Sequence, residues 1–125
     1  MLLNSRFVRG SAATIILGLA VTGVVAFEMP TMEFNGDVEA GKKVAMTRAQ
    51  GNCIACHMIP GGESPGAIGP ALIAMQTRYP DKDALAAQIW DPTVKNPGAV
   101  MPPFGKHGVL SQQEFIDVVE YIWSL

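Results

Sequence analysis

The sequence predicts an all-α fold, and three observations lead to this prediction. Several segments carry apolar residues at the three- and four-residue spacing of a buried helix face. Typical helix-start residues precede these segments, and no segment alternates apolar and polar residues as a strand does. Two stretches rich in Pro and Gly, residues 58–68 and 92–108, predict long loops between the helices. A chain of 125 residues has room for one such domain.

Residues 1–26 are typical of a signal peptide. Arg6 and Arg9 supply a positive start, residues 12–26 carry no charge, and small residues lead up to Ala26. We expect cleavage after Ala26. Retention as an anchor is the alternative, although the apolar run is shorter than the ~20 residues that span a bilayer. Both alternatives predict export to the periplasm, and cleavage would leave no membrane contact.

The remaining chain divides into two parts. Residues 27–36 lack any periodicity and predict a flexible N-terminal arm, whereas residues 37–125 form the predicted domain. Two of the nine basic residues and none of the eleven acidic ones lie in residues 1–26, so the formal charge beyond residue 26 is −4. A mildly acidic chain without a basic stripe makes nucleic acid a poor candidate partner.

The first helix is expected to begin after Asp37, an N-cap residue, and to continue to about Ala49. Val38, Gly41 and Ala45 share one face of this helix. Because Gly41 has no side chain, it leaves room for a second helix to approach closely.

The second and third helices are placed by their start and stop residues. Pro70 suits the first turn of a helix that ends at Pro80. Asp81 is an N-cap for a third helix that continues to about Trp90 and is stopped by Pro92.

The last helix carries the strongest local signal. Ser111 and Glu114 have the spacing of a capping box, and Leu110 with Phe115 forms the hydrophobic staple. A buried stripe then follows at helical spacing: Phe115, Val118, Val119, Ile122 and Trp123.

The stretch Gly51–His57, GNCIACH, carries both cysteines of the chain. A structural zinc site needs four ligands, and the chain offers only two Cys and two His. A thioredoxin-like pair would belong to an α/β setting, and no strands are predicted. A disulfide is chemically possible in the periplasm, but it would leave His57 unexplained.

The pattern Cys-x-x-Cys-His is the attachment motif of c-type haem. One helical turn places the sulfurs of Cys53 and Cys56 along one edge of the porphyrin, where they form thioethers with its vinyl groups. The adjacent His57 then reaches the iron as its proximal ligand. We therefore predict one covalently attached haem c, which would also fill the core of a small domain.

The second axial ligand has several candidates. They are Met29, Met32, Met46, Met58, Met75, Met101 and His107. Met101 is favoured because it lies in the second loop, where Pro102 and Pro103 stiffen the backbone that presents its sulfur. His107 is the second choice. An iron with two protein ligands has no vacancy for substrate, which favours electron transfer over chemistry at the iron.

A proximal histidine normally donates its second N–H to an acceptor that fixes the ring. The segment Gly69-Pro70 follows the first loop, and the Pro70 carbonyl is a candidate acceptor, although a plain helix-start role for Pro70 remains open. Arg78 and Trp90 are candidate donors to the haem propionates, with ordinary structural roles as the alternative.

The order of motifs resembles a class I cytochrome c: a Gly-bearing first helix, CxxCH, Gly-Pro, Met-Pro and an aromatic last helix. The resemblance implies that the first and last helices cross, with Gly41 opposite Tyr121 and Trp123. It also gives Pro70 the role of proximal acceptor. Ala45 stands where many members carry an aromatic residue, which implies a looser crossing.

More particular segments, among them GNCIACHMIPGGESPGAIGP and VMPPFGKHGVLSQQE, are similar to the SoxX family of cytochrome subunits. This resemblance implies a periplasmic heterodimer with a haem-bearing SoxA-type cytochrome, acting as an L-cysteine S-thiosulfotransferase that joins thiosulfate to a cysteine of the carrier SoxYZ. The chain would accept electrons from the SoxA haem and pass them to a downstream c-type cytochrome. A free-standing electron carrier is the alternative, and a haem peroxidase is a weaker third hypothesis.

Overall fold

The computed structural model describes residues 28–125, and the predicted signal peptide lies outside this range. Its regular elements are four α-helices and two short 3-10 turns, and no strand occurs between residues 28 and 125. In chain order they are α1 (Val38–Met46), η1 (Cys53–Ala55), α2 (Met75–Arg78), α3 (Lys82–Trp90), η2 (Pro92–Val94) and α4 (Gln112–Trp123). The all-α prediction is therefore confirmed. None of the helices in this range is long and apolar enough to cross a membrane.

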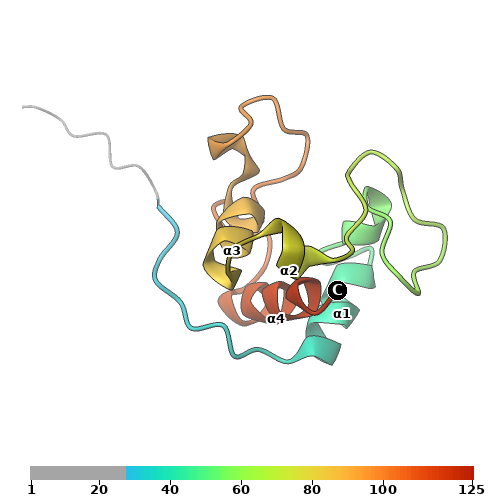
Figure 1. Ribbon diagram of the computed structural model, residues 1–125, viewed down its shortest axis with the longest axis horizontal. Coiled ribbons are helices and arrows are strands. Elements are labelled where there is room, and N and C mark those ends of the chain that lie inside the picture. The colour runs from blue at the N-terminus through green and yellow to red at the C-terminus, as the bar shows by residue number, and fades with distance from the viewer. Residues whose placement is uncertain (1–27) are drawn as a thin grey trace, which may run out of the picture.

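Helix α1 packs across α4, as Figure 1 shows near the bottom of the molecule. A Cβ atom on Gly41 would lie 1.9 Å from the Asp117 carbonyl oxygen and 2.9 Å from Tyr121 Cβ. Only glycine permits this approach, which confirms the predicted role of Gly41. The residues of α4 that it meets are Asp117 and Tyr121, whereas the prediction paired it with Tyr121 and Trp123. Ala45 is fully buried at this crossing.

Local capping signals set the helix starts as predicted. The Asp37 side chain accepts a hydrogen bond from Ala40 N at 2.8 Å, and Asp81 accepts one from Ala84 N at 2.8 Å. At α4 the capping box is complete, because Ser111 Oγ accepts from the Glu114 amide while the Glu114 carboxylate accepts from the Ser111 amide. Each cap satisfies amides that the first helical turn leaves without a partner.

Helix α1 ends at Met46, three residues before the predicted end. Thr47 terminates the helix with an extended backbone, and its hydroxyl donates to the Lys43 carbonyl at 2.6 Å. The chain then folds back, so that Gly51 N donates to Val44 O at 3.1 Å. This turn brings the two cysteines back against the end of α1.

The prediction of a helix starting at Pro70 is wrong, since α2 spans only Met75–Arg78. Distant partners take the backbone amides that such a helix would have used. Leu72 N donates to Met58 O at 2.9 Å, and Ala74 N donates to Leu125 O at 2.7 Å. Ala74 adopts a left-handed conformation, with φ of 50°.

The expected flexible arm needs a partial correction. Residues 28–36 have no regular structure, as expected, but they lie against the domain. Met32 is buried in the core, and Met29 and Phe34 pack against it. Phe27 lies outside the described residues.

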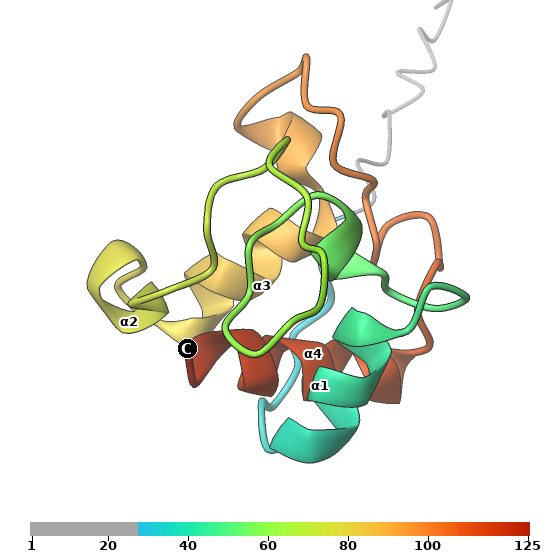
Figure 2. The same ribbon diagram turned by 90° about the vertical axis from the view of Figure 1, so that its right-hand side faces the viewer.

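The two long loops rise on the same side of α4 in Figure 1, the first at the right and the second at the top. The view in Figure 2, turned by 90°, again shows both loops above the crossing of α1 and α4. Helices α3 and α4 lie beneath them and provide buried apolar side chains, among them Leu85, Val118 and Ile122. The two loops and these helices enclose the candidate site.

Candidate functional site

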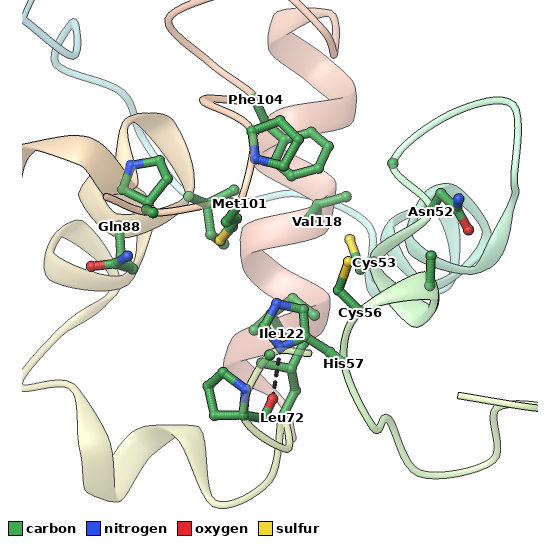
Figure 3. A pocket seen from close by; sticks show the side chains of 18 of the residues that line it. Asn52, Cys53, Cys56, His57, Leu72, Gln88, Met101, Phe104, Val118 and Ile122 are labelled. Carbon is green, nitrogen blue, oxygen red and sulfur yellow. Dashed lines mark hydrogen bonds between the residues drawn. The ribbon is translucent and has the colours of Figure 1, made fainter. Parts of the chain in front are cut away.

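A cavity of about 540 Å³ opens between the two loops and α4. Its lining includes Cys53, Cys56 and His57 from the segment just before the first loop, and Met101 from the second loop. Figure 3 shows these side chains pointing into the same cavity from different sides. The fold thus brings together the predicted thiols, the imidazole and the thioether.

The two cysteines lie on a single tight turn. Cys53 begins the 3-10 turn η1, and the amides of Cys56 and His57 both donate to the Cys53 carbonyl, at 3.2 Å and 2.9 Å. Asn52, just before the turn, adopts a left-handed backbone with φ of 49°. This turn places both sulfurs on one side of the cavity (Figure 3).

Cys53 and Cys56 do not form a disulfide with each other. Burial raises the pKa of the Cys53 thiol to about 11, with a smaller contribution from the nearby Cys56. An uncharged, half-buried thiol at this position is poorly suited to act as an exposed redox thiolate.

His57 is oriented by the backbone of the next segment. Its Nδ1 lies 2.6 Å from the Pro70 carbonyl oxygen (Figure 3). Because a carbonyl can only accept, Nδ1 must carry the proton, and Nε2 is left with its lone pair available for a metal. The Pro70 carbonyl is thus placed as the sequence predicted for the acceptor of a proximal histidine.

Gly69 forms a close contact with the imidazole that the sequence analysis did not identify. A Cβ atom on Gly69 would lie 2.4 Å from His57 Cε1 and 2.6 Å from Nδ1. Only a glycine lets the backbone lie this close to the ring. The Gly-Pro pair therefore fixes the imidazole twice, once by contact and once by the hydrogen bond. The available signal was the glycine directly before Pro70.

Met101 is half-buried and lines the cavity, whereas Val100 beside it is 80% exposed. His107, the other loop candidate, is exposed and is not among the residues that line the cavity. Among the remaining methionines, Met75 lines the cavity but is almost fully buried in α2, and its sulfur accepts from Arg78 at 3.5 Å. Of the two methionines that line the cavity, Met101 is therefore the one that lies in a loop.

The two candidate propionate donors have different positions. Arg78 lines the cavity and donates to the Ala71 carbonyl at 2.7 Å. Trp90 does not line it and instead packs edge-on against Phe115, with ring centroids 5.5 Å apart. Gln88, which the sequence analysis did not consider, lines the side of the cavity away from the cysteines (Figure 3).

Residues 38–125 match the sequence model of the cytochrome c family. The chain belongs to the cytochrome c family. The all-α class I fold predicted from the sequence is therefore confirmed, and membership in this family implies a covalently bound haem c.

Two known proteins are similar to this cytochrome. The crystal structure of SoxXA from P. pantotrophus contains a chain that is similar at a TM-score of 0.64 and 28% identity, over 71% of this cytochrome and 81% of that chain. This likeness supports the resemblance to SoxX that the loop motifs indicate. An uncharacterized lipoprotein of Aquifex aeolicus (strain VF5) is 35% identical over 74 residues, which are 58% of this cytochrome. The matched part covers only 36% of that lipoprotein.

Proposed function

We propose that this cytochrome is the monohaem electron-transfer subunit of a periplasmic SoxXA-type complex. Cys53 and Cys56 would hold one haem c through thioethers, and His57 and Met101 would be the two axial ligands. A single observation carries the proposal: these four side chains, from two segments far apart in the sequence, line the same cavity.

The cavity suits the group that the family implies. Its volume of about 540 Å³ lies within the usual range for bound cofactors. The wall opposite the solvent is apolar and comes from Leu85, Ile89, Val118 and Ile122. The sulfurs lie at one side, so that covalent attachment would fix the orientation of a flat macrocycle. When bound, the haem iron supplies a one-electron redox couple.

The side chains of this protein determine what that couple is used for. The Pro70 carbonyl keeps Nδ1 of His57 protonated and directs Nε2 to the cavity. The second loop presents the Met101 thioether, a ligand type that raises the potential of a haem. Because both axial positions would be taken by side chains, no position is left for a substrate. This arrangement supports electron transfer and argues against a peroxidase.

The proposed reaction of the complex requires an electron acceptor. Joining thiosulfate to a cysteine thiol of the carrier SoxYZ forms an S–S bond and releases two electrons and one proton. This chain would accept the electrons one at a time from the SoxA haem and pass them to a downstream cytochrome. Both of its cysteines would be used in haem attachment, so the L-cysteine S-thiosulfotransferase chemistry would reside in the partner.

Exposed apolar side chains at the cavity support a permanent partner. Ile68, Val100 and Val109 all line the cavity and are 73%, 80% and 47% exposed. Ile68 belongs to the first loop, Val100 to the second, and Val109 follows the second loop. A grouping of exposed apolar residues is typical of a protein interface.

The haem assignment is tested on the exported protein from a host that matures c-type cytochromes. We expect a Soret band, a mass increase of one haem, and a Met-to-iron charge-transfer band in the oxidised protein. Met101→Ala removes that last band, whereas Met58→Ala, an exposed methionine beside His57, retains it. A wild-type protein with haem but without the band would contradict the assignment of Met101.

The subunit assignment is tested by expression beside a SoxA-type cytochrome and size-exclusion chromatography, with a haem assay on each peak. We expect the two cytochromes to elute together. The double variant Ile68→Glu, Val100→Glu places charges on the exposed rim and should elute apart from the partner, and the haem assay separates a loss of partner binding from a loss of haem. Separate elution of the two wild-type proteins would favour a free-standing electron carrier.

A further inference from the structure

We propose that an ion pair between Lys106 and Asp91 closes the neck of the loop that carries Met101 and so positions the Met101 sulfur. Both residues are positioning residues, because neither lines the cavity. The inference rests on the haem site proposed above, since Met101 is the axial ligand there.

The neck of the loop is formed where the chain leaves α3 and returns to it. Asp91 ends α3, residues 92–105 form the loop, and Lys106 returns to the end of the helix. At this point Lys106 N donates to the Trp90 carbonyl at 3.2 Å, and Lys106 Nζ lies 2.5 Å from Asp91 Oδ2. One backbone hydrogen bond and one ion pair, formed by neighbouring residues, therefore hold the two ends of the loop together.

The ion pair joins a buried carboxylate to a lysine at the surface, whose side chain is 38% exposed. Asp91 is only 5% exposed, and its other oxygen accepts from Thr93 N at 3.0 Å and from Thr93 Oγ1. Both carboxylate oxygens are thus engaged, one by each end of the loop. A buried carboxylate that loses its cation is strongly unfavourable, whereas exposed ion pairs contribute little.

The neck is also tied to the helical core. A Cβ atom on Gly105 would lie 1.9 Å from Trp90 Cε3, so the backbone next to Lys106 lies directly on the indole ring. Trp90 in turn packs edge-on against Phe115, which is 1% exposed. The base of the loop therefore has a fixed position relative to α3 and α4.

Within the loop, hydrogen bonds set the path of the chain. Asn96 N donates to Pro92 O at 3.0 Å, and Ala99 N donates to Asn96 O at 2.9 Å. These bonds shape the turn without joining it to a helix, whereas the neck and the buried Phe104 anchor it. Closing a loop costs conformational entropy, so a neck that is already closed lowers the cost of placing the Met101 sulfur at the iron.

The experiment measures how easily an added ligand displaces Met101. Imidazole is titrated into the oxidised holoprotein at neutral pH while the Met-to-iron charge-transfer band is followed. Lys106→Met should bind imidazole roughly tenfold more tightly than wild type, the effect of losing one charge-assisted hydrogen bond. Asp91→Asn should act in the same direction, and Lys106→Arg should restore near wild-type affinity.

Lys82→Met is the matched control. It removes an ion pair of the same type, Lys82 Nζ to Glu120 Oε1 at 2.6 Å, away from the loop. We expect it to lower the thermal stability and leave the imidazole affinity unchanged. If Lys106→Met and Lys82→Met have the same imidazole affinity, the neck is merely structural and the proposal is overturned.

Two further outcomes are decisive. A wild-type protein without the charge-transfer band would refute Met101 as the ligand, which is a failure of the proposed function and distinct from a failure of the neck. Where Lys106→Met and Asp91→Asn do not fold, Thr93→Val removes one hydrogen bond from the same carboxylate. An unchanged imidazole affinity in Thr93→Val would then overturn the proposal, and a tighter affinity would support it.

Discussion

Replacement of Gly69 by alanine tests the orientation of His57 directly. The new Cβ would lie 2.4 Å from His57 Cε1, more than 1 Å inside the ~3.5 Å of an ordinary carbon contact. The ring cannot move away freely, because its Nδ1 is bound to the Pro70 carbonyl at 2.6 Å. Either the imidazole tilts or the Gly-Pro backbone withdraws, and both movements weaken that hydrogen bond.

The expected cost follows from these two effects. Overpacking at a fixed contact costs about 1–3 kcal/mol, and the lost hydrogen bond adds about 1 kcal/mol. Gly69→Ala should therefore lower the free energy of unfolding by about 2–4 kcal/mol, or the thermal midpoint by about 10 °C or more in a domain of this size. The hydrogen bond also increases the basicity of the imidazole. Its weakening should raise the reduction potential by tens of mV, where ~59 mV corresponds to a tenfold one-electron change.

The assay combines thermal unfolding, followed by circular dichroism and by the Soret band, with a redox titration of the holoprotein. Gly98→Ala is the matched control, because a Cβ there meets only Asn96 Oδ1 at 3.6 Å. It should be neutral or slightly stabilising. A Gly69→Ala protein that equals Gly98→Ala in both midpoint and potential would refute the proposed link between the Gly-Pro contact and the haem ligand.

Three other predictions concern attachment, packing and charge. The double variant Cys53→Ser, Cys56→Ser should carry no covalent haem and fail to fold stably, since the haem would fill the cavity; a compact, helical product by circular dichroism would contradict this. Gly41→Ala should lower the free energy of unfolding by about 1–3 kcal/mol in chemical denaturation, because its Cβ meets backbone atoms of α4 at 1.9 Å, and a more stable variant would disprove it. The pKa of the Asp91 carboxyl lies below its ordinary value of 3.8, mainly because Lys106 and then Thr93 donate hydrogen bonds to it. The ionised carboxylate therefore stabilises the fold above pH 3.8, and this stabilisation is lost as the pH falls through the lower pKa of the folded state. The thermal midpoint of Lys106→Met should therefore lie furthest below that of the wild type at neutral pH, and the difference should shrink in acid. A difference that does not depend on pH would argue against a stabilising ion pair between Lys106 and Asp91.

The sequence by itself determined the features that depend on near neighbours. The starts of α1, α3 and α4 were predicted correctly, because each depends on a cap residue that bonds to an amide three residues further on: Asp37, Asp81 and Ser111. The spacing of Cys53 and Cys56 likewise depends on one local turn, which is sufficient to predict haem attachment.

Tertiary structure decided the features whose partners lie far along the chain. The helix expected at Pro70 did not form, because the amides of residues 72 and 74 bond to Met58 and Leu125. Met32 is buried against the domain although its segment has no periodicity. The ion pair between Lys106 and Asp91 could not be predicted from the sequence, because the two residues are 15 positions apart and meet only where the loop closes. Local hydrogen bonds are encoded within a few residues, whereas packing and loop closure depend on where the whole chain brings its segments together.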